Sequence, residues 1–215
     1  MPSYSFVATA VAAEQCGYCP YMIDIDPDTW MLDPEALALH PLIDQVGLVI
    51  PVAPYGRPVA QAPWQRFHAA TGIPVVVDGA ASFDRVIAAP AAFVGPIPVT
   101  FSFHATKSYS SGEGGGVAST DLTLIERARQ ALNFGFQGAR DCRMPSTNGK
   151  ISEYHAAVGL AEDDGWADKA RSLQAVIDGY RGFLGSRFYG APDLSLSYGL
   201  LLCDTLAQAD ALAIF

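Results

Sequence analysis

Two residues of this 215-residue chain have the types and positions needed for covalent chemistry. Asp78 ends the run PVVVD, and Lys107 follows VTFSFHAT. Each comes just past a buried apolar run, where an open α/β sheet places its ligands. A lysine among close-packed apolar and small residues can lose its proton and form a Schiff base with a carbonyl. An aspartate can hold a pyridine nitrogen protonated, so that the ring acts as an electron sink. Together they indicate pyridoxal phosphate chemistry.

The residues around Lys107 fit the same interpretation. The glycines of SGEGGGV, residues 111–117, let the backbone pass close to a cofactor or to a neighbouring chain, where a Cβ atom would clash. Ser102, five residues before the lysine, could offer its hydroxyl to a phosphate.

The elements that must position these residues alternate between helices and strands. Apolar periodicity and start signals predict helices near 7–15, 33–37 and 63–71, and strands near 20–24, 47–52, 74–77, 98–103 and 115–120. Later segments predict helices at 121–136, from 152 to about 187 and at 207–215, with a strand at 194–205. The βαβ rhythm predicts an α/β fold with a mostly parallel sheet covered by helices on both faces.

Composition narrows the function classes. Half of the residues are apolar and the net charge is −9, which argues against a nucleic-acid partner because such domains carry a basic face. No run of eighteen apolar residues could span a bilayer, and the N-terminus has no basic signal-peptide region, so we expect a cytoplasmic protein. The four cysteines include only one C-x-x-C pair, at 16–19, so we expect reduced thiols and no metal site.

Three alternative motifs fail on spacing. DIDPDTWMLDPE resembles a calcium loop, but its sixth position is Thr29 where glycine is needed. A phosphate-binding loop ending in TKS would need glycines where Phe101 and Thr106 stand. A serine nucleophile with S-x-x-K spacing would need serine where His104 stands, which is better explained as a packed histidine beside the site.

A longer series of motifs resembles the DegT/DnrJ/StrS family of pyridoxal-phosphate sugar aminotransferases. The matching segments are PSYSFVATA at 2–10, PYMIDIDPDTWMLDPEAL at 20–37, PVAPYGRPV at 51–59, VVVDGAASFD at 75–84, SFHATKSYSSGEGGGV at 102–117, ALNFGF at 131–136 and STNGKISEYHAAVGLA at 146–161. The resemblance covers nearly the whole chain. It implies a fold-type-I large domain at 1–188, N-terminally incomplete, and the start of a truncated small domain at 189–215.

The resemblance also implies roles for matching positions. Lys107 would form the Schiff base with the cofactor and move the proton during transfer, and Asp78 would pair with the pyridinium nitrogen. Phe6 would stack on the cofactor ring, and Ser102 would bind its phosphate. Asn148 would reach the phosphate of the partner subunit, which implies a homodimer with shared active sites.

The chain departs from the family pattern at one site residue and at both ends. The position three after Asp78 is Ala81, where the family usually has Gln or His beside the cofactor's ring hydroxyl. The segment before PSYSF and most of the small domain are not in the chain, which we therefore expect to be a fragment. A dehydratase branch of the family has histidine in place of the lysine, and Lys107 argues against that branch.

The function that follows is transfer of an amino group from an amino acid donor to a keto group of a nucleotide-linked sugar. The alternative is a catalytically inactive fragment or a non-enzymatic interaction subunit that keeps the scaffold. Lys107 in its full motif favours the enzyme, whereas the two ends favour the alternative.

Overall fold

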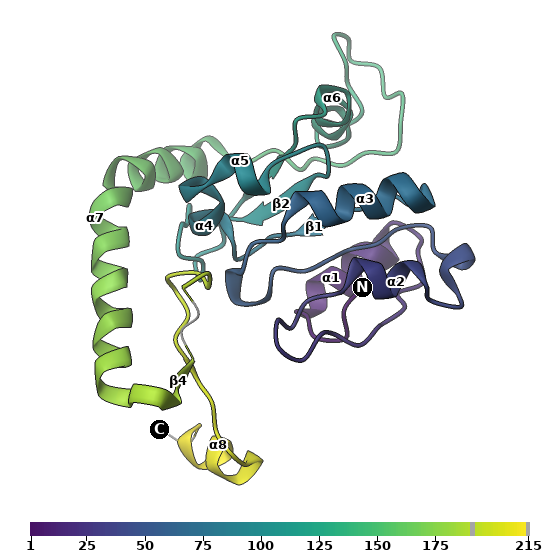
Figure 1. The fold of residues 1–215 in the computed structure, drawn as a ribbon. Helices are drawn as coiled ribbons and strands as arrows, with labels where there is room; N and C mark the ends of the chain where they lie inside the picture. The colour runs from purple at the N-terminus through teal and green to yellow at the C-terminus, as the bar shows by residue number, and fades with distance from the viewer. Residues whose placement is uncertain (190–191, 214–215) are drawn as a thin grey trace.

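The computed structural model describes residues 1–189 and 192–213, with a small mixed sheet at its centre (Figure 1). Strand β1, Val77–Asp78, lies parallel to β2, Val99–Ser102, which pairs antiparallel with β3, Gly115–Ala118. The segment predicted as a strand at 47–52 joins the sheet only through parallel bridges, Val49 to Val75 and Val52 to Asp78. The predicted strand at 20–24 is reduced to one bridge, Pro2 to Ile23.

Prolines explain why the strands are so short. Pro51, Pro74 and Pro98 lie in or beside the three parallel segments, and proline has no N–H to donate to a ladder. Their carbonyls are still used, because the backbone N–H groups of Val49, Val77 and Asp78 donate to the carbonyls of Pro74, Pro98 and Pro51. The parallel arrangement is therefore kept without long strands.

Three predicted helices cover this region, and two of them have recognisable caps. Helix α1 is Val7–Gln15, α2 is Pro34–Ala38 and α3 is Gln61–Thr71. The Asp33 side chain accepts the N–H of Glu35 at the start of α2, and Gly72 ends α3 in the left-handed conformation. Helix α3 buries Trp64 and Phe67 against the valines of the sheet, which form the core.

Two further helices were not predicted. Helix α4, Phe83–Ala88, and α5, Pro90–Phe93, contain six and four residues, too few to show a helical period. Single 3₁₀ turns occur at Ile43–Gln45, Pro54–Gly56 and Gly185–Arg187.

The second half of the chain is mainly helical. Helix α6 is Leu122–Ala131, shorter than predicted because Phe134 and Gly135 take positive φ angles just after it. Helix α7, Glu153–Leu184, runs along one side of the molecule (Figure 1). Strand β4, Phe188–Tyr189, pairs antiparallel with β5, Leu200–Leu201, followed by α8, Leu206–Leu212. Of the predicted strand at 194–205 only β5 forms, and residues 214–215 of the last predicted helix lie outside the described residues.

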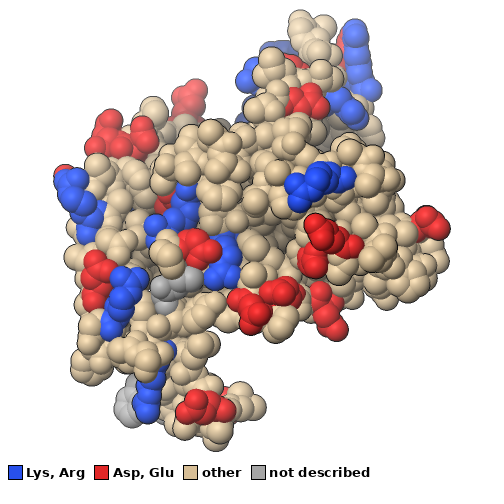
Figure 2. All heavy atoms as spheres, in the orientation of Figure 1, with Lys and Arg blue, Asp and Glu red and all other residues tan. Residues whose placement is uncertain are grey.

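Charged side chains of both signs are scattered over the face shown in Figure 2, with wide uncharged areas between them. Across residues 1–189 and 192–213, no helix combines the length and the apolar character that crossing a membrane requires.

Candidate active site

Asp78 and Lys107 line the same cavity, of about 320 Å³. Five segments far apart in the sequence build it: the residues before α1, the turn after Val52, the end of β1, the loop after β2 and the C-terminal segment around Tyr198. The lining residues are Tyr4, Ser5, Phe6, Val52, Ala53, Pro54, Tyr55, Asp78, Ala80, Ala81, Lys107 and Tyr198. The cavity therefore lies at the carboxyl ends of the parallel segments, as the sequence predicts.

The carboxylate of Asp78 is held from two sides. Thr9 Oγ1 donates to its Oδ2 at 2.6 Å, and the backbone N–H of Ala80 donates to its Oδ1 at 3.1 Å. The backbone of Asp78 is fixed in turn, because it pairs with Thr100 on β2 and bridges to Val52. Both the position and the orientation of this acidic group are thus set by the fold.

Lys107 is half-buried in a turn, and the residues beside it in the chain are fixed by packing and hydrogen bonds. Its backbone N–H donates to the His104 carbonyl at 2.9 Å, and Ser108 and Tyr109 beside it are buried. The Tyr109 ring packs against Phe83, and its hydroxyl donates to the Gly159 carbonyl on α7. These contacts therefore fix the backbone of Lys107. Among the residues that the structure describes, none forms an ion pair with Lys107.

Of the other predicted cofactor residues, one lines this cavity and two do not. Phe6 lines the cavity and leaves 77% of its surface exposed, so one ring face is free. Ser102 ends β2 but does not line the cavity, and its Oγ accepts the N–H of His104 at 3.3 Å. Asn148 lies beside a separate cavity with Gly114 and His155 and bridges to Asn133. One chain thus brings together Phe6, Asp78 and Lys107 only.

Sequence reasoning missed the aromatic wall of the cavity. The ring centroid of Tyr55 lies 6.1 Å from that of Tyr4 and 5.3 Å from that of Tyr198. The hydroxyls of Tyr4 and Tyr55 form a short hydrogen bond. Burial, reinforced by that bond, raises the pKa of Tyr4 to about 12, and burial likewise raises the pKa of Tyr198. Tyr55 has a positive φ of 50°, which no sequence pattern marked.

Tyr198 reaches the cavity because a buried carboxylate fixes its segment. Asp84 on α4 accepts the N–H of Leu196 at 2.8 Å and the hydroxyl of Ser195 at 3.1 Å. The N–H of Ser195 also donates to the Tyr55 carbonyl at 2.9 Å. A Cβ atom at Gly56 would lie 2.4 Å from the Ser195 Cβ, so glycine is required for this approach. The C-terminal segment thereby closes one side of the cavity.

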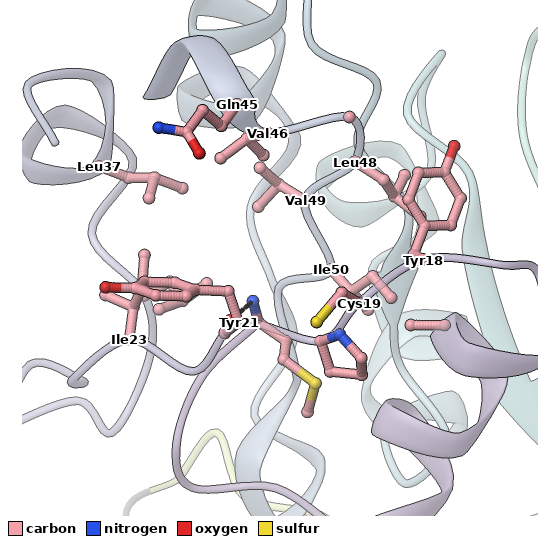
Figure 3. Close-up of a pocket in the computed structure, with 15 residues that line it drawn as sticks. Tyr18, Cys19, Tyr21, Ile23, Leu37, Gln45, Val46, Leu48, Val49 and Ile50 are labelled. Carbon is pink, nitrogen blue, oxygen red and sulfur yellow. Dashed lines mark hydrogen bonds between the residues drawn. The ribbon is translucent and has the colours of Figure 1, made fainter. Parts of the chain in front are cut away.

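A second cavity, of about 200 Å³, lies between residues 18–23 and 45–50 (Figure 3). Side chains such as Ile23, Leu37 and Val49 line it, and neither Asp78 nor Lys107 does. Its polar groups include Tyr18, Gln45 and the terminal amine of Met1, which donates to the Tyr21 carbonyl at 3.0 Å. In the described part of the chain, no group of three or more metal-ligating side chains occurs there or elsewhere.

Comparisons with known proteins show which family the chain is similar to. The model of the DegT/DnrJ/EryC1/StrS aminotransferase family matches residues 1–180. Protein Rv3402c of Mycobacterium tuberculosis is 36% identical over 186 residues, which are 84% of this chain and 45% of that protein. A dTDP-4-amino-4,6-dideoxy-D-glucose transaminase of Shigella dysenteriae is 30% identical over 159 residues, 74% of this chain and 43% of the enzyme.

Solved structures extend the likeness to the fold. DesI, crystallised in the presence of its TDP-sugar product, superposes with a TM-score of 0.77 at 31% identity, over 93% of this chain and 52% of DesI. A family aminotransferase from Brucella abortus gives a TM-score of 0.75 at 22% identity, over 91% of this chain and 56% of that one. The predicted α/β, fold-type-I architecture is confirmed, and the chain spans about half the length of these relatives. It belongs to the DegT/DnrJ/EryC1/StrS aminotransferase family.

Proposed function

We propose that this chain forms the cofactor-binding part of a pyridoxal-phosphate-dependent aminotransferase. In this proposal an amino acid donates the amino group, and a keto group of a nucleotide-linked sugar accepts it. The observation that carries the proposal is the shared cavity of Asp78 and Lys107, with the carboxylate of Asp78 held by two donors. The names of the matched relatives, a dTDP-sugar transaminase and DesI, support the substrate class.

The residues present fit this cofactor. The cavity offers an amine at Lys107, an oriented carboxylate at Asp78 and an open aromatic face at Phe6. When bound, pyridoxal phosphate supplies an electron sink for the carbon that gains or loses the amino group. Asp78 would keep the ring nitrogen protonated, and Lys107 would hold the cofactor and then move the proton. Ala81 presents no side-chain donor or acceptor to the ring hydroxyl.

The proposal includes a homodimer. Asn148 and Lys150 lie beside a cavity that Lys107 does not line, which supports a role for Asn148 in the site of a second copy. Several apolar side chains of α7 are exposed, among them Tyr154, Leu160 and Phe183 at 70–86%. Exposed apolar surface of this extent is typical of interaction sites. Ser102 stays a proposed phosphate ligand, and the domain boundary after residue 188 and the cytoplasmic location stay predictions.

The experiment uses the small number of lysines in the chain, which are Lys107, Lys150 and Lys169. The purified chain is mixed with pyridoxal phosphate, its visible spectrum is recorded, and borohydride reduction is followed by peptide mass mapping. We expect a visible band and a reduced adduct on Lys107. Lys107→Ala should abolish both, whereas the control Lys169→Ala should keep both. An adduct spread over all three lysines would overturn the proposal and favour the non-catalytic alternative.

A further inference from the structure

Thr9 occupies an unusual place for a hydroxyl group. It lies in the first turn of α1, within the otherwise apolar run VATAVAA, and only 4% of its surface is exposed. A buried hydroxyl without a partner destabilises the folded state, so its hydrogen bond is structurally required. That partner is the Oδ2 atom of Asp78, at 2.6 Å.

The direction of the hydrogen bonds around Thr9 follows from proton counting. An ionised carboxylate can only accept, so the single hydroxyl proton of Thr9 is committed to Asp78. The Ser5 hydroxyl lies 2.7 Å from Thr9 Oγ1 and is the donor in that contact, which is closer than its other acceptor, the Phe6 carbonyl at 3.3 Å. Ser5 lines the cavity, so a directed relay runs from Ser5 through Thr9 to Asp78.

This relay supplements the contact from Ala80. With Thr9 on Oδ2 and the Ala80 N–H on Oδ1, neither oxygen can rotate away without losing a charge-assisted hydrogen bond. The N-terminal end of α1 also attracts the negatively charged carboxylate of Asp78, because the N-terminal end of a helix carries partial positive charge.

We propose that Thr9 is a positioning residue, which keeps the carboxylate of Asp78 turned toward the ring nitrogen of the cofactor, with Ser5 as its supporting donor. The inference rests on the proposed function, because it concerns the same site. Thr9 does not line the cavity, so it acts through Asp78 alone.

The experiment compares two variants that change Thr9 in opposite ways. Thr9→Val keeps the branched shape and loses the donor, whereas Thr9→Ser keeps the donor and loses the methyl group. Two readouts are taken on the full chain: the dissociation constant of pyridoxal phosphate, and the pH midpoint of the visible band of the lysine-bound cofactor. A charge-assisted hydrogen bond of ordinary strength predicts that Thr9→Val weakens binding about tenfold.

The pH midpoint should move upward by about one unit in Thr9→Val. Asp78, once misaligned, holds the proton of the ring nitrogen less firmly, so that positive charge no longer opposes protonation of the Lys107 nitrogen. Thr9→Ser should restore both values to near wild type, which a packing role would not do. Thr100→Val is the matched control, because its hydroxyl bonds the Val77 carbonyl beside Asp78 without touching the carboxylate.

Unchanged binding and midpoint in Thr9→Val would overturn the inference while the wild-type band still supports the proposed function. If the wild-type chain gave no band on Lys107, the proposed function would fail first. If Thr9→Val does not fold, Ser5→Ala is measured instead. The relay requires that Ser5→Ala moves the pH midpoint upward by less than the one unit expected for Thr9→Val. An unchanged midpoint in Ser5→Ala would refute the relay.

Discussion

Residues 1–120 and residues 121–213 differ sharply in how they bury their side chains. The core lies in the first region, with Trp64, Phe67 and Val77 at 2–3% exposure. In the second region neither α6 nor α7 has a buried residue, although α7 is 32 residues long. Tertiary packing of an apolar face supplies most of the stability of protein helices. The cavity therefore depends on the first region, and the helices of the second are held mainly by local contacts.

The two regions meet at a few defined contacts. Tyr109 packs its ring 5.5 Å from that of Trp166 on α7, and Asp84 binds the segment of Ser195 and Leu196. Both contacts lie close to Lys107 in the chain. Tyr109, two residues after it, makes the first, and the Ser108 hydroxyl lies 3.3 Å from the Ser195 hydroxyl of the second. The second region thus reaches the site through one segment that the first region fixes.

The largest test of this contrast replaces one phenylalanine in each region. Phe67→Ala should lower the free energy of unfolding by about 3–5 kcal/mol, because it opens a cavity in the core. In dilute solution, where the chain is monomeric, Phe183→Ala at an 86% exposed position should change the free energy of unfolding by less than about 0.5 kcal/mol. Urea denaturation followed by circular dichroism measures both. Similar losses would show that α7 is packed as firmly as the core.

The next test breaks the contact between the regions. Asp84→Ala leaves the Leu196 N–H and the Ser195 hydroxyl without their acceptor, which should lower the free energy of unfolding by about 1–3 kcal/mol. The control is Asp168→Ala, whose exposed pair with Arg171 should contribute less than about 1 kcal/mol. Denaturant titration of the two variants gives the difference. Equal effects would mean that Asp84 does not hold the C-terminal segment.

Local signals predicted much of the first region. The start signal of the helix predicted at 33–37 and the apolar runs at 47–52 and 74–77 each act within a few residues, so rules for periodicity and helix starts apply. Asp78 and Lys107 could be found because chemistry at strand ends follows from the sheet itself. The prediction of a strand at 20–24 was wrong beyond a single bridge. Ile23 packs against the core, but among the described residues its neighbours form no further pairs with another strand.

Long-range contacts explain what the sequence could not predict. Thr9 meets Asp78 across 69 positions, and Ser195 meets Asp84 across 111. Ser195 stands in no quoted motif, and Thr9 lies in the segment PSYSFVATA without a role assigned to it, although a lone hydroxyl in an alanine-rich helix is a usable signal for Thr9. Ser102 was predicted from its position before Lys107 and from the family resemblance, and Asn148 from the resemblance alone; their place beside the cofactor stays a prediction.

A smaller test compares two glycines with open space around them. Gly179 lies within α7, and Gly179→Ala should raise the free energy of unfolding by about 0.5–1 kcal/mol, because alanine favours the helix. Gly72 has a φ of 71°, so Gly72→Ala should lower it by about 1 kcal/mol through backbone strain. Thermal and urea unfolding show whether each variant raises or lowers the free energy of unfolding. A loss in Gly179→Ala would indicate that a neighbour occupies that face of α7.

The smallest effect concerns the pH dependence of the cavity wall. Because burial and the bond with Tyr55 raise the pKa of Tyr4 to about 12, the folded state favours the neutral phenol. Its contribution to stability is therefore fully present below about pH 10, the pKa of an unfolded tyrosine, and is lost as the pH rises toward 12. Absorbance at alkaline pH should show late tyrosine ionisations, because the pKa values of Tyr109 and Tyr198 are raised as well. Tyr4→Phe should reduce the amplitude of the latest step by one phenol, whereas Tyr180→Phe, on the exposed surface of α7, should leave that step unchanged. An unchanged latest step in Tyr4→Phe would show that Tyr4 is not the phenol whose pKa is raised most, and would weaken the contrast between the cavity wall and the exposed helix.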